Sequence, residues 1–186
     1  PIFLSTERLL LRDFVEDDCP AVLAYQNDPR YLRFYAWTKR TPEDVQGFVA
    51  RFIAQQEREP RLKFQLAITL PAAGQLIGNA GIRIKTAGGH EADIGYELDP
   101  RHWGQGYASE AARALVQFGF DRLRLHRISA HCLAENVASA RVLEKLGMRL
   151  EGRLRDSEHF KGRYWDTLHY AILDHEFAMP EGRHDL

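Results

Sequence analysis

The segment from residue 91 to residue 133 constrains the fold of this chain most strongly, because it reads as a strand, a helix and a second strand. Its two ends, 91–98 and 126–133, are short and place apolar residues in alternation with polar ones, as strands of a sheet do. Between them, residues 107–123 place their apolar side chains at the spacing of one helical face. A helical connection of this length joins strands that run in the same direction. We therefore expect one parallel strand pair at the centre of the sheet.

Turn signals on both sides of this unit predict antiparallel strands around it. Pro71-Ala72-Ala73-Gly74 and Phe160-Lys161-Gly162-Arg163 each separate two strand patterns, as the turn of a hairpin does. The remaining strands are expected at about 62–70, 75–85, 148–158 and 164–174, with a first strand that ends near Phe14. The remaining helices are expected to begin near Asp17, at Thr41 and at Asn136, the last ending at Gly147. The order β-α-α-β-β-β-α-β-α-β-β predicts a single mixed α/β domain over residues 1–186.

Composition removes several classes of function. The formal net charge of −1 lacks the basic excess with which nucleic-acid-binding domains contact phosphates. Cys19 and Cys132 form no C-x-x-C pair, and the eight histidines contain no H-E-x-x-H motif. No apolar run reaches the ~18 residues of a membrane-spanning helix. We expect a cytoplasmic protein with no metal site and with neither nucleic acid nor membrane as partner.

The stretch from Asp93 to Ala111 carries the chemistry, because it passes from a strand through a glycine-containing turn to a helix N-terminus. Unpaired backbone N–H groups at such a terminus bind phosphate-bearing ligands. On glycine spacing alone, a turn without any ligand remains an equal alternative. A dinucleotide fingerprint fails, because Ser109 stands where the third glycine is required. A P-loop is excluded as well, since no Gly-Lys-Ser/Thr follows.

Three separated motifs resemble those of the GNAT superfamily of N-acetyltransferases. Arg101-x-x-Gly104-x-Gly106-x-Ala108 is similar to the pyrophosphate-binding motif of that family. Thr6-Glu7-Arg8-Leu9 and the segment from Glu135 to Met148 resemble the branch that contains ribosomal-protein N-terminal acetyltransferases. The matching segments run from residue 6 to about 174 in the family's order. The resemblance implies a GNAT-like fold in which strands 91–98 and 126–133 splay apart, and it makes a homodimer plausible.

The resemblance also implies acetyl-CoA as co-substrate, with no metal. Backbone groups near Leu98 would pair with the pantetheine arm, and those of Gly104 to Ser109 would hold the pyrophosphate. The cofactor-binding residues expected from the motifs are Leu98, Arg101, Trp103, Gly104, Gln105, Gly106, Tyr107, Ala108, Ser109, Asn136 and Ser139.

Five residues are catalytic candidates. Asn136 stands where a helix N-cap belongs, and the resemblance adds a role toward the cofactor or the acceptor. Ser139 resembles the family position close to the coenzyme sulfur, so it is the candidate acid for the departing thiolate; the alternative is an ordinary first-turn serine. Glu158 is the preferred base and Glu97 the second, with His159 third. Charged residues near strand ends are commonly just solvated, and that interpretation stays open for each.

The sequence constrains the identity of the acceptor less than that of the co-substrate. Phe34, Tyr35 and Trp37 either pack in the core or, as the resemblance implies, wall the acceptor side. The neighbouring Arg30, Arg33 and Lys39 would oppose a cationic polyamine more than a peptide. A peptide α-amine has a pKa of about 7.7–8.0, so roughly a tenth is neutral at pH 7 and weak base catalysis suffices. We favour a protein or peptide N-terminus; the alternatives are a small amine (amino sugar, aminoglycoside or polyamine) and a non-catalytic acetyl-CoA-binding regulator.

Overall fold

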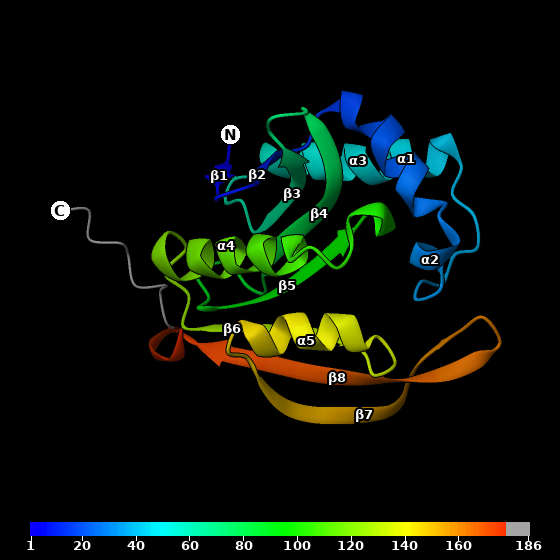
Figure 1. Ribbon diagram of the computed structural model, residues 1–186. Helices are drawn as coiled ribbons and strands as arrows, with labels where there is room; N and C mark the ends of the chain where they lie inside the picture. Colours follow the sequence, from blue (N-terminus) through cyan, green and yellow to red (C-terminus); the bar gives the residue numbers. More distant parts are fainter. Residues whose placement is uncertain (178–186) are drawn as a thin grey trace.

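One eight-stranded sheet organises the computed structural model, which describes residues 1–177 (Figure 1). The strands lie in the order β1-β2-β3-β4-β5-β6-β8-β7. They are β1 (Phe3–Ser5), β2 (Leu10–Asp13), β3 (Lys63–Leu70), β4 (Gln75–Ile84), β5 (Glu91–Leu98), β6 (Arg127–Leu133), β7 (Arg149–Phe160) and β8 (Arg163–Leu173). The helices are α1 (Cys19–Gln26), α2 (Pro29–Leu32), α3 (Pro42–Gln56), α4 (Tyr107–Asp121) and α5 (Val137–Lys145).

The predicted parallel pair is confirmed, and it is short. Strands β5 and β6 pair in parallel only over Glu91–Asp93 and Arg127–Ser129, while every other neighbouring pair is antiparallel. Beyond Asp93 and Ser129 the two strands continue to Leu98 and Leu133 without pairing to each other. Their facing backbone groups are left open to a ligand at the point where the expected splay occurs.

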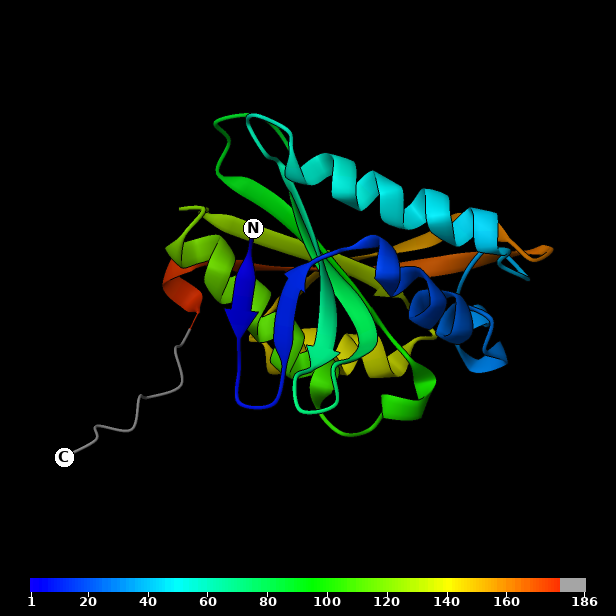
Figure 2. The same cartoon turned by 90° about the horizontal axis from the view of Figure 1, so that it is seen from above.

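Helices cover both faces of the sheet and define two apolar clusters. Seen from above, α3 lies on one side and α4 and α5 lie on the other (Figure 2). The α4 side holds the larger cluster, with Leu66 and Ile77 among its members, and the other side packs Ala67 and Leu76 under α1 and α3. Adjacent residues of one strand thus enter different clusters, as the pleat of a strand requires.

Two elements were absent from the sequence-based prediction. Strand β1 pairs with β2 in a hairpin ahead of the predicted first strand. The one-turn helix α2 lies in the predicted aromatic connector; Asp28 caps it by accepting a hydrogen bond from Arg30 N at 2.9 Å, and Pro29 begins it. Both are too short to show a hydrophobic period, which is why the pattern missed them.

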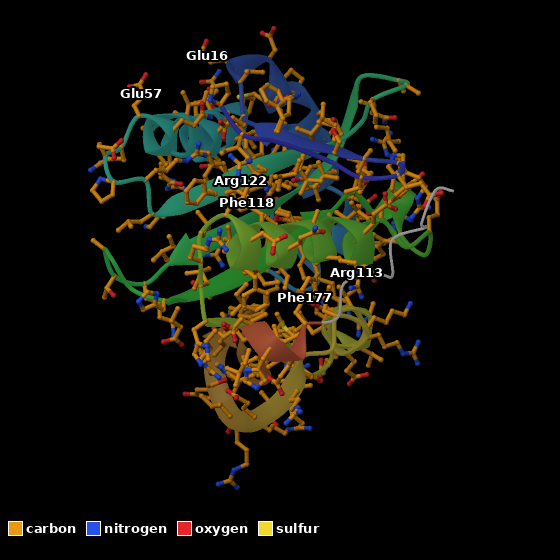
Figure 3. The ribbon with its side chains drawn as sticks, turned by 90° about the vertical axis from the view of Figure 1, so that its left-hand side faces the viewer. Glu16, Glu57, Arg113, Phe118, Arg122 and Phe177 are labelled. Atoms are coloured by element: carbon orange, nitrogen blue, oxygen red, sulfur yellow. The ribbon has the colours of Figure 1, made fainter. Side chains whose placement is uncertain are left out.

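Helix α4 packs its apolar face on the sheet and also contacts the last described residue. Phe118 meets Phe64 of β3 edge-on, with ring centroids 5.4 Å apart. Arg113 lies over the ring of Phe177 at 5.6 Å, and Arg122 lies over Phe118 at 5.3 Å (Figure 3). Residue 177, which follows β8, is therefore packed against α4. None of the helices within residues 1–177 is long and apolar enough to cross a membrane.

Candidate active site

A cavity of about 410 Å³ opens beside the end of β5, where that strand no longer pairs with β6. Its walls come from α2 and the connector after it, the end of β5, the turn into α4, and α5. The lining residues are Tyr31, Phe34, Tyr35, Tyr96, Glu97, Leu98, His102, Trp103, Gly104, Gly106, Tyr107, Ala108, Ser109, Asn136, Ala138, Ser139, Arg141, Val142 and Lys145. Sequence positions more than a hundred residues apart thus meet in one hollow.

The end of β5 divides this cavity into two halves. Tyr96 and Leu98 belong to the cluster on the α4 side of the sheet. Glu97 points to the other face, where Tyr25 and Tyr31 of α1 and α2 donate hydrogen bonds to it. We call the first the cofactor half and the second the acceptor half. A ligand that passes through the splay can therefore reach both faces of the sheet.

The turn before α4 has the conformation that the sequence predicted for phosphate binding. Gly104 and Gly106 adopt positive φ values of 74° and 83°, which residues with a Cβ rarely adopt. Gly106 is the N-cap of α4 and supplies no side chain to the first-turn N–H groups. The N–H groups that follow, on Tyr107 to Ser109, have the geometry that suits a pyrophosphate. The residues present fit the coenzyme A moiety of acetyl-CoA.

Two basic residues that sequence reasoning missed lie on the same half. Arg141 and Lys145 line the cavity from one face of α5, since they are four residues apart on a helix. Their positive charges can pair with the phosphates of a coenzyme. The signal in the sequence was the i, i+4 spacing of two cations after the Asn136 cap.

Arg101 and Gln105 are placed differently from the other expected cofactor residues. The Arg101 guanidinium forms an ion pair with Asp99 at 2.7 Å, and neither Arg101 nor Gln105 is among the residues that line the cavity. Burial would raise the pKa of Asp99, but the hydrogen bonds and charge of Arg101 outweigh it and lower that pKa. Trp103 does line the cavity, with its indole N–H donating to the Leu98 carbonyl at 2.9 Å.

The N-terminal motif of the sequence holds the first turn of α4 in place. Glu110 accepts hydrogen bonds from Thr6 Oγ1 at 2.6 Å, from Arg8 N at 2.8 Å and from Arg8 Nε at 2.7 Å. Arg8 also donates to the Gln105 carbonyl at 2.9 Å and lies over the Tyr107 ring at 4.4 Å. The two motifs that seemed independent in the sequence are thus one physical unit. We call Thr6, Arg8 and Glu110 the α4 clamp.

Ser139 and Asn136 lie together at the start of α5. Asn136 caps the helix, since its Oδ1 accepts a hydrogen bond from Ser139 N at 3.2 Å. The Ser139 hydroxyl lies 3.0 Å from the Tyr96 hydroxyl, which can also donate to the Ser139 carbonyl at 3.0 Å. Burial raises the pKa of Tyr96, so its phenol stays protonated at neutral pH. Tyr96 was not singled out in the sequence; a tyrosine two residues before Leu98 faces the same side of β5, and that period was the available signal.

Aromatic rings form the wall of the acceptor half. Tyr31 stacks on Tyr35 with ring centroids 4.2 Å apart, and Tyr35 stacks on Trp37 at 5.3 Å. Phe34 and Tyr35 line the cavity, as the wall interpretation expected, and Tyr31 joins them. Trp37 is not among the lining residues and lies behind Tyr35 with Arg40 over its ring at 4.4 Å. Its position supports the wall from behind.

Glu97 is the anion of the acceptor half. Its Oε1 accepts hydrogen bonds from Tyr25 Oη at 2.7 Å, Gln26 Nε2 at 2.8 Å and Asn79 Nδ2 at 2.6 Å. Its Oε2 accepts one from Tyr31 Oη at 2.7 Å. Donors from α1, α2 and β4 thus fix this half-buried carboxylate in one orientation.

Glu158 lies on β7, outside the set of residues that line the cavity. It pairs in register with the buried Trp165 of β8. Three residues further on, Lys161 at the hairpin turn donates to the Leu32 carbonyl of α2, and Arg163 pairs with Glu135 at 2.8 Å. The hairpin therefore reaches the acceptor side, with its turn below α2 (Figure 1).

The comparisons with known proteins define the class. The family model described as "Acetyltransferase (GNAT) domain" matches residues 8–149. The uncharacterized N-acetyltransferase YnaD of Bacillus subtilis is 36% identical over 174 residues, which cover 94% of this chain and 98% of the relative. A solved GNAT-family acetyltransferase from Bacillus anthracis is 35% identical, has a TM-score of 0.82, and covers 94% of this chain and all of its own.

A second relative matches a shorter part of the chain. The ribosomal-protein-serine acetyltransferase of Escherichia coli is 38% identical over 84 residues, which cover 45% of this chain and 47% of that protein.

This chain belongs to the GNAT family. It is an acetyl-CoA-dependent N-acetyltransferase with the mixed α/β fold of that family. Within residues 1–177, no group of three or more metal-ligating side chains lies together.

Proposed function

We propose that this N-acetyltransferase acetylates the α-amine of a protein or peptide N-terminus by direct transfer within a ternary complex. The observation that carries the proposal is the single cavity whose cofactor half and acceptor half meet at the end of β5. Such a cavity holds donor and acceptor at the same time, so that no acetylated enzyme is needed between them. The partial likeness to a ribosomal-protein-serine acetyltransferase supports a protein N-terminus as acceptor.

Ser139 is the proposed acid. As the amine nitrogen bonds to the thioester carbon and loses a proton to the base, the C–S bond breaks, and the departing thiolate takes a proton from the Ser139 hydroxyl. Exchange with solvent then returns a proton to Ser139 and removes one from the base. Tyr96 can donate in turn to Ser139 Oγ across 3.0 Å. Asn136 supports this step by fixing the first turn of α5 through the Ser139 N–H.

Glu158 is the proposed base, acting through water. The hairpin that carries Glu158 contacts two elements near the cavity. Lys161 donates to α2, and Arg163 contacts the loop before α5. An α-amine is already partly neutral at pH 7, so a carboxylate that is not in direct contact with it suffices.

The pH dependence of kcat/KM for the acceptor tests this assignment. In Glu158→Gln we expect the acidic limb of the profile to disappear and the rate at pH 7 to fall by about 10²-fold, as loss of a general base does. The matched control is Glu151→Gln on the same strand, whose carboxylate is paired with Arg127 at 2.6 Å. A wild-type acidic limb in Glu158→Gln would exclude Glu158 as the base.

A small amine is the second candidate acceptor. The aromatic wall made by Tyr31, Phe34 and Tyr35 could hold a compact amine as well as the first residue of a peptide. Coenzyme A release with a panel of small amines distinguishes this candidate from the first.

A further inference from the structure

Glu97 carries a negative charge that no cation balances. Among residues 1–177, none of the lysines, arginines or histidines forms an ion pair with it. Arg40 joins its network only indirectly, since it donates to Gln26 Oε1 at 3.0 Å and Gln26 in turn donates to Glu97. Buried or half-buried charges in proteins are normally paired. A carboxylate that lines a cavity and is paired with no cation of the chain is therefore a candidate to bind a cationic ligand.

The groups around Glu97 are neutral hydrogen-bond donors. Burial, and after it the charge of Glu97, raises the pKa of Tyr25, Tyr31 and Tyr35. All three phenols therefore remain protonated and donate or orient toward the carboxylate. Asn79 adds an amide donor and is itself held by Gln65 at 2.6 Å. These donors are uncharged, so none of them supplies a counter-ion to the carboxylate.

The two oxygens of Glu97 differ in what they can still accept. Oε1 already receives three hydrogen bonds, whereas Oε2 receives one within the described residues, from Tyr31. Oε2 is therefore the oxygen with fewer partners, and the Tyr35 hydroxyl also interacts with this carboxylate. Tyr31 itself, Phe34 and Tyr35 line the cavity beside it. Aromatic faces next to an anion attract an ammonium ion by their quadrupole.

We propose that Glu97 Oε2 and the rings of Tyr31, Phe34 and Tyr35 form a binding site for the ammonium group of the acceptor. The acceptor binds as a primary ammonium ion. This site orients the acceptor nitrogen at the end of β5 before that nitrogen loses its proton to the base. Glu97 is then a positioning and specificity-determining residue, and the base is a different group. The inference rests on the proposed function, because it assigns the recognition step of that same cavity.

Equilibrium binding without turnover tests this proposal. The protein is saturated with coenzyme A, which carries no acetyl group, and titrated at pH 7 with n-butylammonium chloride or with the uncharged n-butanol. We expect the ammonium probe to bind the wild type at least about tenfold more tightly than the alcohol, and to compete with it. Sodium chloride at equal ionic strength controls for unspecific salt effects.

Variants locate the preference on Glu97. Glu97→Gln keeps the shape and the acceptor oxygen but removes the charge, so the preference for the ammonium probe should vanish. Glu91→Gln, at the start of the same strand and paired with Lys85 at 2.7 Å, should retain it. Tyr31→Phe, which removes one donor but leaves the charge, should retain it too. If Glu97→Gln does not fold, the wild-type comparison of the two probes still decides.

Equal affinity for the two probes in the wild type, or an unchanged preference in Glu97→Gln, would overturn the ammonium site. The proposed function fails separately: a protein that prefers butylammonium but transfers no acetyl group would contradict the function and support the site. A protein that acetylates peptides while binding both probes equally would support the proposed function and contradict the ammonium site.

Discussion

Ser139 links the cap of α5 to the chemistry of the cavity. Its backbone N–H donates to the capping Asn136, which places Ser139 in the first turn of α5. Ser139 also lines the cavity. The Tyr96 hydroxyl lies against it from β5 at 3.0 Å. The resemblance of the segment from Glu135 onward was enough to single out Ser139. It gave no information on Tyr96, because the contact between them joins residues 43 positions apart.

Replacing Ser139 separates its chemical role from its structural one. In Ser139→Ala the cap persists, since Asn136 bonds to the backbone, but the proton donor is lost. We expect kcat to fall by about 10²-fold, while the KM for acetyl-CoA stays within about twofold. Steady-state kinetics with the best acceptor measures both constants. Tyr96→Phe, which keeps the serine hydroxyl, should lower kcat by less; an unchanged kcat in Ser139→Ala would remove it as the acid.

The turn before α4 illustrates how a conformation serves a ligand at the level of one element. Gly104 and Gly88 have nearly equal φ values, 74° and 73°, and an added Cβ would meet no atom within 4 Å at either position. Gly88 lies in the loop between β4 and β5, outside the residues that line the cavity. The chain therefore contains a matched pair of strained sites, only one of which faces the cavity.

We predict that Gly104→Ala and Gly88→Ala destabilise the fold equally but affect binding unequally. Each alanine in a left-handed conformation costs about 1–2 kcal/mol of stability. The free energy of unfolding, from urea denaturation, should fall by similar amounts in both variants. The affinity for acetyl-CoA, from isothermal calorimetry, should fall by about tenfold in Gly104→Ala alone. Equal affinities in the two variants would show that this turn does not contact the coenzyme.

The α4 clamp couples stability to pH. Burial would raise the pKa of Glu110, but the hydrogen bonds from Thr6 and Arg8 outweigh it and lower that pKa below 4.5. A carboxylate with a lowered folded-state pKa stabilises the fold above its unfolded-state pKa, and this contribution disappears as the pH falls through the folded-state value.

Glu110→Gln should therefore lower the free energy of unfolding by about 1–2 kcal/mol at pH 7, through the loss of charge-assisted hydrogen bonds. The difference from the wild type should narrow as the pH falls below 4.5. Urea unfolding at a series of pH values measures it. Glu57→Gln, at the exposed end of α3 (Figure 3), is the control, because Glu57 lies outside the α4 clamp. A pH-independent difference would contradict a role for the charge.

The elements themselves were largely predictable, and their exceptions have a physical reason. Strand β5 was expected at 91–98 and lies there, and α4 was expected at about 107–123 and ends at Asp121. Long amphipathic patterns are set by burial on one face, which the sequence displays. The hydrogen-bond network around Glu97 was not predictable, because its donors come from α1, α2 and β4 and meet only after the sheet has formed.

On the scale of the whole molecule, the splay of β5 from β6 opens the sheet at its centre, while one apolar cluster continues across both sides of it. Three residue pairs hold the strands together, and the remaining facing backbone groups have no partner in the other strand. An acetyl-CoA molecule in the splay would supply hydrogen bonds to these groups. Amide hydrogen exchange should therefore slow at residues 94–98 and 130–133 when acetyl-CoA is added, and change little in β3 and β8. Protection confined to other parts of the chain would place the coenzyme elsewhere.

Release of coenzyme A from acetyl-CoA, with the products identified by mass, tests the central claim most directly. The protein is given peptides that differ in their first residue, beside a panel of small amines. The account predicts that peptides gain one acetyl group on the α-amine, with a preference among first residues. Acetylation of small amines alone would overturn the proposed acceptor and keep the enzyme class. Binding of acetyl-CoA without acetylation of any amine would contradict the account of this cavity as a site of acetyl transfer.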